Sequence, residues 1–355
     1  MNKKRLMDLL VMKKKPKVLI IGTGGTISAK LKNGIYNYGE ITQEDVINLI
    51  PDVRKHVDIE TTNIFRMDSS DMTPENWITL ANAIYHKMQD YDGIVITIGM
   101  DTLHYADTAI SFLIQNNNIP IVFTSALYDM GQLNTDAKRN MRNAITVAGF
   151  SDIAETVLVF NSNIFRATRT KKINASEFNA FKEASELPLG KIEEFIKFNK
   201  PYQKRSKKKA KLYTSLETDI ALIKVYPGFD GNRIKQMVDL DVKGIVLEGF
   251  GLGNIPVFDN NMKEAIKYAN KKNIPIVITS GSFMGKYWRE LYKPDIGNRL
   301  KGMDTIPAYD MLPETAYVKL MWVLAQTRDF EQVKKMMQKN YVGEISDDIK
   351  LRNVL

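Results

Sequence analysis

The sequence predicts an α/β fold with two domains, a larger N-terminal domain with a doubly wound, mostly parallel sheet and a smaller C-terminal α/β domain. Short apolar runs of strand length alternate with helical patterns, as in parallel sheets covered by helices. A chain of 355 residues is long enough for two such domains. A strongly basic stretch separates the two series of elements.

The first series predicts a domain over residues 17–200. Its clearest helix begins at Thr73-Pro74-Glu75, because a threonine cap, a proline in the first turn and an acidic residue together mark a helix start. This helix is expected to end near Asp90. Strands are expected at five apolar runs, which are Lys17–Ile21, Ile59–Phe65, Gly93–Thr97, Ile119–Thr124 and Thr156–Phe160.

The second series predicts a smaller domain over residues 215–355. Strands are expected at Ile220–Val225, Gly244–Leu247 and Ile274–Thr279. Helices are expected at Arg233–Leu240, Asn261–Lys272 and Thr315–Thr327.

A basic linker is predicted over residues 201–214. The stretch from Lys204 to Lys211 holds six cations in eight residues and no apolar side chain larger than alanine. Such a run repels itself and stays solvated, so we interpret it as a linker. The alternative is a phosphate-binding strip, although no aromatic residues are interleaved with the cations.

Composition excludes several kinds of site. The chain has no cysteine, which excludes disulfides, thiolate metal sites and a cysteine nucleophile, and fits a cytoplasmic location. Its three histidines are not at metal-ligand spacing, so no metal is expected. The net charge of +9 is mostly due to lysine and does not by itself indicate nucleic-acid binding.

An N-terminal extension over residues 1–16 precedes the first strand. Its short apolar stretch contains Asp8 and is followed by lysines without a small-residue cleavage site, so export is not expected. Met12 is an alternative start. No apolar run reaches the roughly 18–20 residues that span a bilayer.

The first glycine cluster, Gly22-Thr23-Gly24-Gly25-Thr26, directly follows a buried strand, where open α/β sheets bind ligands. A dinucleotide fingerprint fails because Ile27 stands where the third glycine belongs. The chain also lacks the G-x-S-x-G sequence of serine hydrolases. Two interpretations remain open, a threonine nucleophile and a tight turn that needs glycines.

Two further clusters are candidates for the same edge of the sheet. Gly99-Met100-Asp101-Thr102 follows another buried strand, and an acid there can hold a substrate ammonium group. Asp68-Ser69-Ser70-Asp71 precedes the capped helix and could equally be a polar loop. We interpret His104 as a surface or capping residue.

Together these clusters resemble the L-asparaginase family of amidohydrolases, most closely its cytoplasmic type I branch. The resemblance covers nearly the whole chain from residue 17. Its motifs are Thr23–Ile27, Asp68–Glu75, Ile94–Thr102, Arg169–Phe181 and Gly244–Asn254.

The resemblance implies roles for individual residues. Thr26 matches the threonine that attacks the side-chain amide of asparagine, Tyr36 a tyrosine that polarises that hydroxyl, and Lys172 a lysine near the substrate. Substrate-binding residues match at Asp68, Ser69, Gly99 and Asp101. The resemblance implies no cofactor, an amino acid substrate, and a homodimer or homotetramer. From the composition and the apolar runs, neither a membrane nor a nucleic acid is expected as a partner.

One departure from the family pattern affects the chemistry. The second signature normally reads His-Gly-Thr-Asp-Thr, and here Met100 replaces its first threonine. A thioether cannot donate a proton, so the acid–base relay loses a member. This departure leaves open a catalytically impaired amino-acid-binding protein. A further alternative, supported only by the basic linker, is the ammonia-releasing subunit of a transfer-RNA-dependent amidotransferase.

Overall fold

The computed structural model describes residues 14–33, 35–38, 41–257, 261–286 and 303–346. Most of the N-terminal extension, including Met12, lies outside these ranges. The chain divides into two compact units, the first ending at Thr214 and the second beginning at Ser215. None of the described helices is both long and apolar enough to span a membrane.

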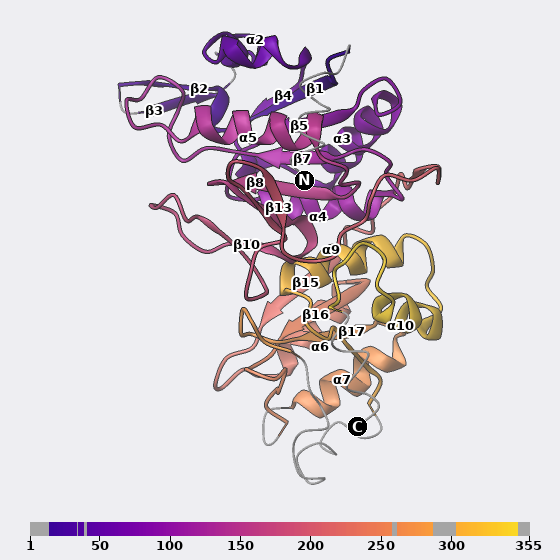
Figure 1. Ribbon diagram of the computed structural model, residues 1–355. Coiled ribbons are helices and arrows are strands. Elements are labelled where there is room, and N and C mark those ends of the chain that lie inside the picture. The colour runs from indigo at the N-terminus through magenta and orange to yellow at the C-terminus, as the bar shows by residue number, and fades with distance from the viewer. Residues whose placement is uncertain (1–13, 34, 39–40, 258–260, 287–302, 347–355) are drawn as a thin grey trace. The chain divides into compact units, whose positions relative to one another are not determined.

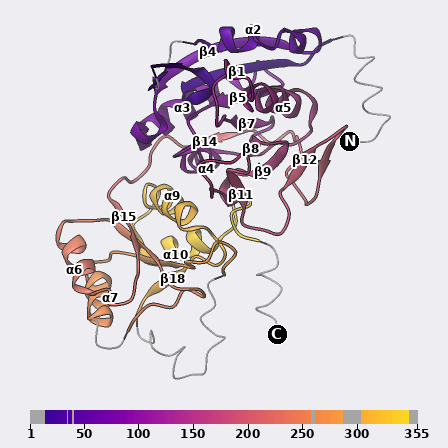
Figure 2. The ribbon, with the colours of Figure 1, turned by 90° about the vertical axis from the view of Figure 1, so that its left-hand side faces the viewer.

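The first unit contains an eight-stranded sheet in the order β13-β12-β9-β8-β7-β5-β1-β4. Figure 2 shows much of this succession, from β4 to β12. The five strands from β8 to β4 are parallel, as expected, and most of their residues are buried. They are β1 (Lys17–Gly24), β4 (Asp58–Met67), β5 (Gly93–Thr97), β7 (Ile121–Thr124) and β8 (Thr156–Phe160).

Short antiparallel strands extend this sheet and were not predicted. They are β9 (Asn163–Arg166), β12 (Gly190–Ile192) and β13 (Ile196–Phe198). Three two-stranded pairs accompany the sheet, namely β2 (Ala29–Lys32) with β3 (Ile35–Tyr38), β6 (Ile114–Gln115) with β14 (Lys211–Leu212), and β10 (Thr170–Lys172) with β11 (Phe181–Glu183).

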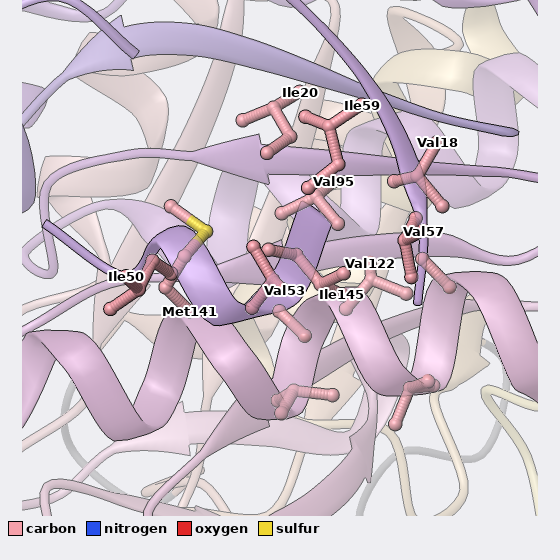
Figure 3. Close-up of a cluster of buried hydrophobic side chains, with 14 of the residues drawn as sticks. Val18, Ile20, Ile50, Val53, Val57, Ile59, Val95, Val122, Met141 and Ile145 are labelled. Carbon is pink, nitrogen blue, oxygen red and sulfur yellow. The ribbon is translucent and has the colours of Figure 1, made fainter. Parts of the chain in front are cut away.

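Helices cover both faces of the sheet. On one face α2 (Gln43–Asn48) and α5 (Ala137–Phe150) bury a cluster of aliphatic side chains. Figure 3 shows Met141 and Ile145 of α5 in one cluster with Val95 and Val122 of the strands. None of the buried side chains of α3 (Pro74–Lys87) or α4 (Leu103–Leu113) belongs to that cluster, and these two helices pack together on the opposite face.

The β7–α5–β8 crossover has the opposite handedness to the crossovers through α3 and α4. The chain advances across the sheet in one direction from β4 to β5, β7 and β8, yet α3 and α4 lie on one face and α5 on the other. Two crossovers in the same direction on opposite faces have opposite hands. Since such crossovers are nearly always right-handed, the β7–α5–β8 connection is the exceptional, left-handed one. No local sequence pattern indicates this hand.

The second unit contains a four-stranded parallel sheet in the order β15-β16-β17-β18. The strands are β15 (Ile220–Lys224), β16 (Gly244–Glu248), β17 (Ile276–Thr279) and β18 (Thr305–Pro307). Helices α6 (Asn232–Asp239) and α7 (Met262–Lys271), adjacent in Figure 1, share a core with this sheet. Helix α9 (Pro313–Leu324) packs against β15 and β16, and the unpredicted α10 (Phe330–Gln338) packs against α9.

A buried ion pair lies inside the second unit. The Lys319 ammonium on α9 donates to Glu344 at 2.6 Å and to the carbonyl of Met337 at 2.9 Å, and both charged side chains are fully buried. Glu344 also accepts from the backbone N–H of Val342 at 2.8 Å. Lys319 therefore ties the chain after α10 to α9.

Candidate active site

The candidate site lies where the order of the parallel strands reverses. Strand β1 is flanked by β4 and β5, so the chain leaves β1 toward one side of the sheet and later continues on the other. Ligands of open α/β sheets bind at this point, outside the carboxyl ends of the strands. The three polar clusters predicted from the sequence follow β1, β4 and β5 here.

Glycines bring these loops into direct contact. Gly24 has φ +115°, and a Cβ on it would lie 2.1 Å from the Met67 carbonyl oxygen at the end of β4. Gly25 has φ +78°, and a Cβ there would lie 2.3 Å from the backbone nitrogen of Gly99, after β5. Only glycine allows both this backbone conformation and this close approach. The first loop is thus packed between the other two.

The two threonines of the first loop have different environments. Thr23 is buried, and its hydroxyl donates to the Thr97 carbonyl of β5 at 2.9 Å. Thr26 is half-buried and begins a 3₁₀ turn over Thr26–Ser28. The Thr23 hydroxyl therefore links two strands, while Thr26 remains partly exposed beyond the end of β1.

The second loop positions Ser69 against the third. Ser69 is 2% exposed, and a Cβ on Gly99 would lie 2.6 Å from its Oγ. The Asp101 N–H donates to Ser69 Oγ at 3.2 Å, and the Thr102 hydroxyl donates to the Ser69 carbonyl at 2.6 Å. Asp68 accepts from the Ser70 N–H at 2.8 Å and so caps the turn that begins at Ser69.

Lys172 and Asp101 form an ion pair at this edge. Lys172 is the last residue of β10, and its side chain is 18% exposed, against 64% for Asp101. The pair therefore combines a sheltered ammonium with a carboxylate that remains open on one side. The structure thus places Lys172 beside the second signature.

Tyr36 is placed only through its backbone. It lies in β3 and pairs with Leu31 of β2, in a hairpin that starts at Ala29, directly after the turn containing Thr26. The Tyr36 side chain lies outside the described residues.

Met100 and His104 are both buried. Met100 is 7% exposed, so its thioether lies within the protein at the position of the family threonine. The interpretation of His104 as a surface or capping residue is wrong, because it lies in the first turn of α4 with 7% exposure. Within the described ranges, no group of three acidic or histidine side chains could hold a metal ion.

Two hydroxyls fix the third loop. Thr102 belongs to a cluster that the sequence singled out, and its hydroxyl donates to the Ser69 carbonyl. Sequence reasoning missed the second, because it assigned no role to buried Ser125, which donates to the Ile98 carbonyl at 2.5 Å. The sequence predicted one sheet edge for these loops, but their direct contact through Gly25 and Gly99 emerges only in the structure.

Comparison with family models gives two matches. The model described as "Asparaginase, N-terminal" matches residues 17–204, and the one described as "Glutaminase/Asparaginase C-terminal domain" matches residues 219–337.

Individual relatives are similar over most of the chain. An L-asparaginase from Thermococcus kodakarensis is 35% identical over 337 residues, covering 93% of this chain and 99% of that protein. A glutamyl-tRNA(Gln) amidotransferase subunit from Pyrococcus abyssi is 34% identical over 346 residues, covering 93% of this chain and 77% of that protein.

Two solved structures are similar to this chain over most of its length. The thermostable L-asparaginase from Thermococcus kodakarensis superposes with a TM-score of 0.85 at 32% identity, covering 93% of this chain and 99% of that one. L-asparaginase I from Vibrio cholerae superposes with a TM-score of 0.84 at 29% identity, covering 94% of this chain and all of that one.

Proposed function

Because this chain belongs to the asparaginase family, we propose that it hydrolyses L-asparagine to L-aspartate and ammonia through Thr26. The observation that supports this most is the contact of Gly25 with Gly99, since it holds the Thr26 loop against the loop that contains Asp101. A nucleophile and an acid that can hold an ammonium group are then neighbours at one edge of the sheet.

The proposed reaction has two steps. The Thr26 oxygen attacks the side-chain amide carbon, and the tetrahedral intermediate expels ammonia to leave an acyl-enzyme ester. Water then cleaves the ester, giving aspartate and restoring the hydroxyl. Backbone N–H groups near the glycines would stabilise the oxyanion in both steps.

The remaining side chains bind the substrate. Asp101 would pair with the α-ammonium group, and Ser69 would donate to the α-carboxylate, with Asp68 and Gly99 holding Ser69 in place. Lys172 would stabilise the negative charge of the Asp101 carboxylate, with which it forms an ion pair. Since Met100 cannot relay a proton, Lys172 would exchange protons with Thr26 through water, and we expect a slow enzyme.

A second candidate function comes from the names of several relatives. Subunits of glutamyl-tRNA(Gln) amidotransferases from Pyrococcus and Methanothermobacter are 33–34% identical over 346 residues. In this alternative the same Thr26 chemistry would supply ammonia to a partner. In a third alternative, the protein binds asparagine without turning it over.

Ammonia release by the purified protein tests the proposal. Thr26→Ala should lower the rate by at least about 100-fold, while Thr26→Ser should retain part of it because the hydroxyl is kept. Equal rates for the wild type and Thr26→Ala would overturn the catalytic role. Asparagine binding by calorimetry without any turnover would instead favour the third alternative.

Other expectations from the sequence stay predictions. They are the homodimer or homotetramer, the cytoplasmic location and the role of Tyr36. An ammonia-releasing subunit would be distinguished from a free-standing enzyme by weak asparagine turnover that rises when a partner is added.

A further inference from the structure

The basic strip, defined as residues 204–211, concentrates the charge of the molecule. It holds six cations and no acidic residue, in a chain whose net charge is +9. All six cationic side chains belong to exposed residues. The strip therefore creates a local electrostatic potential more positive than the composition of the whole chain indicates.

Both ends of this predicted linker are attached to the first unit. Lys204 forms a β-bridge with Ile153, and the Arg205 guanidinium donates to the Asp92 carbonyl at 2.7 Å. At the other end, Lys211 and Leu212 form β14 and pair with β6. The strip thus follows a fixed path over the unit.

The central lysines are available to a partner. Lys204 lies 3.8 Å from Asp152, and Arg205 bonds backbone carbonyls, so the first two cations are partly engaged. Among the described residues, no acidic side chain forms an ion pair with Lys207, Lys208 or Lys209. Because their backbone is anchored on both sides, binding a partner would order the side chains and little of the main chain.

The strip crosses the edge of the sheet opposite the candidate active site. Its contacts Asp92 and Ser151 precede β5 and β8, and β6 precedes β7. These are the amino-terminal ends of the parallel strands, while Thr26 and Asp101 follow their carboxyl ends. A partner on the strip would leave the active-site edge of this unit uncovered.

We propose that the basic strip binds the phosphate backbone of a polynucleotide. Closely spaced lysines on a segment anchored at both ends match a row of phosphates, and the absence of large apolar side chains disfavours insertion into a membrane. The strip offers no side chains that read bases, so binding is independent of sequence. This inference does not depend on the proposed hydrolase activity.

Fluorescence anisotropy with a labelled 20-nucleotide single-stranded RNA tests the strip. The triple variant Lys207→Gln, Lys208→Gln, Lys209→Gln should weaken binding at least about tenfold in low salt. In a plot of log affinity against log salt concentration, the magnitude of the slope should fall by about 2. Each of the three lost phosphate contacts contributes roughly 0.7. A DNA strand of the same sequence should behave alike, and an RNA-only effect would identify RNA as the source of the phosphates.

A matched control removes the same charge elsewhere. Lys267→Gln, Lys271→Gln and Lys272→Gln, exposed positions on or next to α7, should leave RNA binding within about twofold of the wild type. Equal loss in both triple variants would overturn the proposal, because net charge alone would then explain binding. Undetectable RNA binding by the wild type, or a strip effect seen only with phosphatidylserine vesicles, would overturn it too.

Discussion

At the scale of the residue, Met100 is the position that most affects the expected rate. It is buried at the second signature, where a hydroxyl would complete the proton relay. We predict that Met100→Thr raises asparagine turnover by about 10²-fold, the lower end of what an acid–base partner contributes. Loss of buried volume should lower stability by about 1–3 kcal/mol.

The control for this change is Met100→Val, which matches threonine in shape and lacks the hydroxyl. Ammonia release should rise in Met100→Thr alone. A similar rise in both variants would show that removing the thioether, and not adding the hydroxyl, matters.

Asp107 gives a second prediction at this scale. It is fully buried on α4, and burial raises the pKa of its carboxyl well above the usual range. The folded protein therefore keeps the proton that the unfolded chain releases above about pH 4, so the contribution of Asp107 to stability falls as pH rises. Asp107→Asn, which cannot ionise, should melt at a higher temperature than the wild type at pH 8.

Melting temperatures measured from pH 4 to pH 8 check this. The difference between Asp107→Asn and the wild type should shrink steadily toward pH 4. A constant difference across this range would contradict a raised pKa in the folded state.

Single residues also show where sequence reasoning ends. The polar character of Lys319 and His104 suggests exposure, yet both are buried. The Lys319 ammonium donates to Glu344 and to the carbonyls of Met337 and Lys339. No local sequence pattern indicates these contacts. Burial of a polar side chain depends on distant partners, so it follows from the tertiary structure.

At the scale of the element, the glycine loop after β1 joins three segments of the site. We predict that Gly25→Ala lowers stability by about 2–5 kcal/mol, combining a positive φ with the overlap with Gly99. Asparagine turnover should fall at least about 100-fold because the loops separate. Urea unfolding and ammonia release measure the two effects.

Gly228→Ala isolates the contribution of the backbone. Gly228 has φ +82°, and a Cβ there would meet nothing within 4 Å. This variant should lose only about 1–2 kcal/mol and keep full turnover. If Gly25→Ala were equally mild, the contact between the two loops would not be required.

The strands that could be predicted are the parallel ones, four of which contain continuous apolar runs, while β4 is rich in β-branched residues. Each of the five parallel strands overlaps its expected range, and the Thr73 cap was expected, with Asn76 accepting from the Thr73 N–H at 2.8 Å. The antiparallel strands β12 and β13 have three residues each, too few for an alternating pattern to emerge. Strand β12 is set by pairing with β9, and β13 by pairing with β12.

At the scale of the whole molecule, the sequence led to the family and to a two-part α/β architecture, which the comparisons and the two sheets confirm. It also named Lys172 and Asp101, which the fold brings together across 71 residues of chain. The contacts among the three loops could not be predicted, because those depend on strand order. Thr26 as nucleophile stays a proposal until its variants are assayed.

The polarity of the parallel sheet has a consequence for how this protein can change during evolution. At β5, the loop that contains Asp101 lies at one end and an anchor of the basic strip at the other, separated by a strand of five residues, roughly 17 Å. Substitutions that alter charge at the amino-terminal edge need not disturb the packed glycines at the carboxyl edge. A lineage could therefore gain or lose a polyanionic partner while its hydrolytic chemistry remains under separate selection.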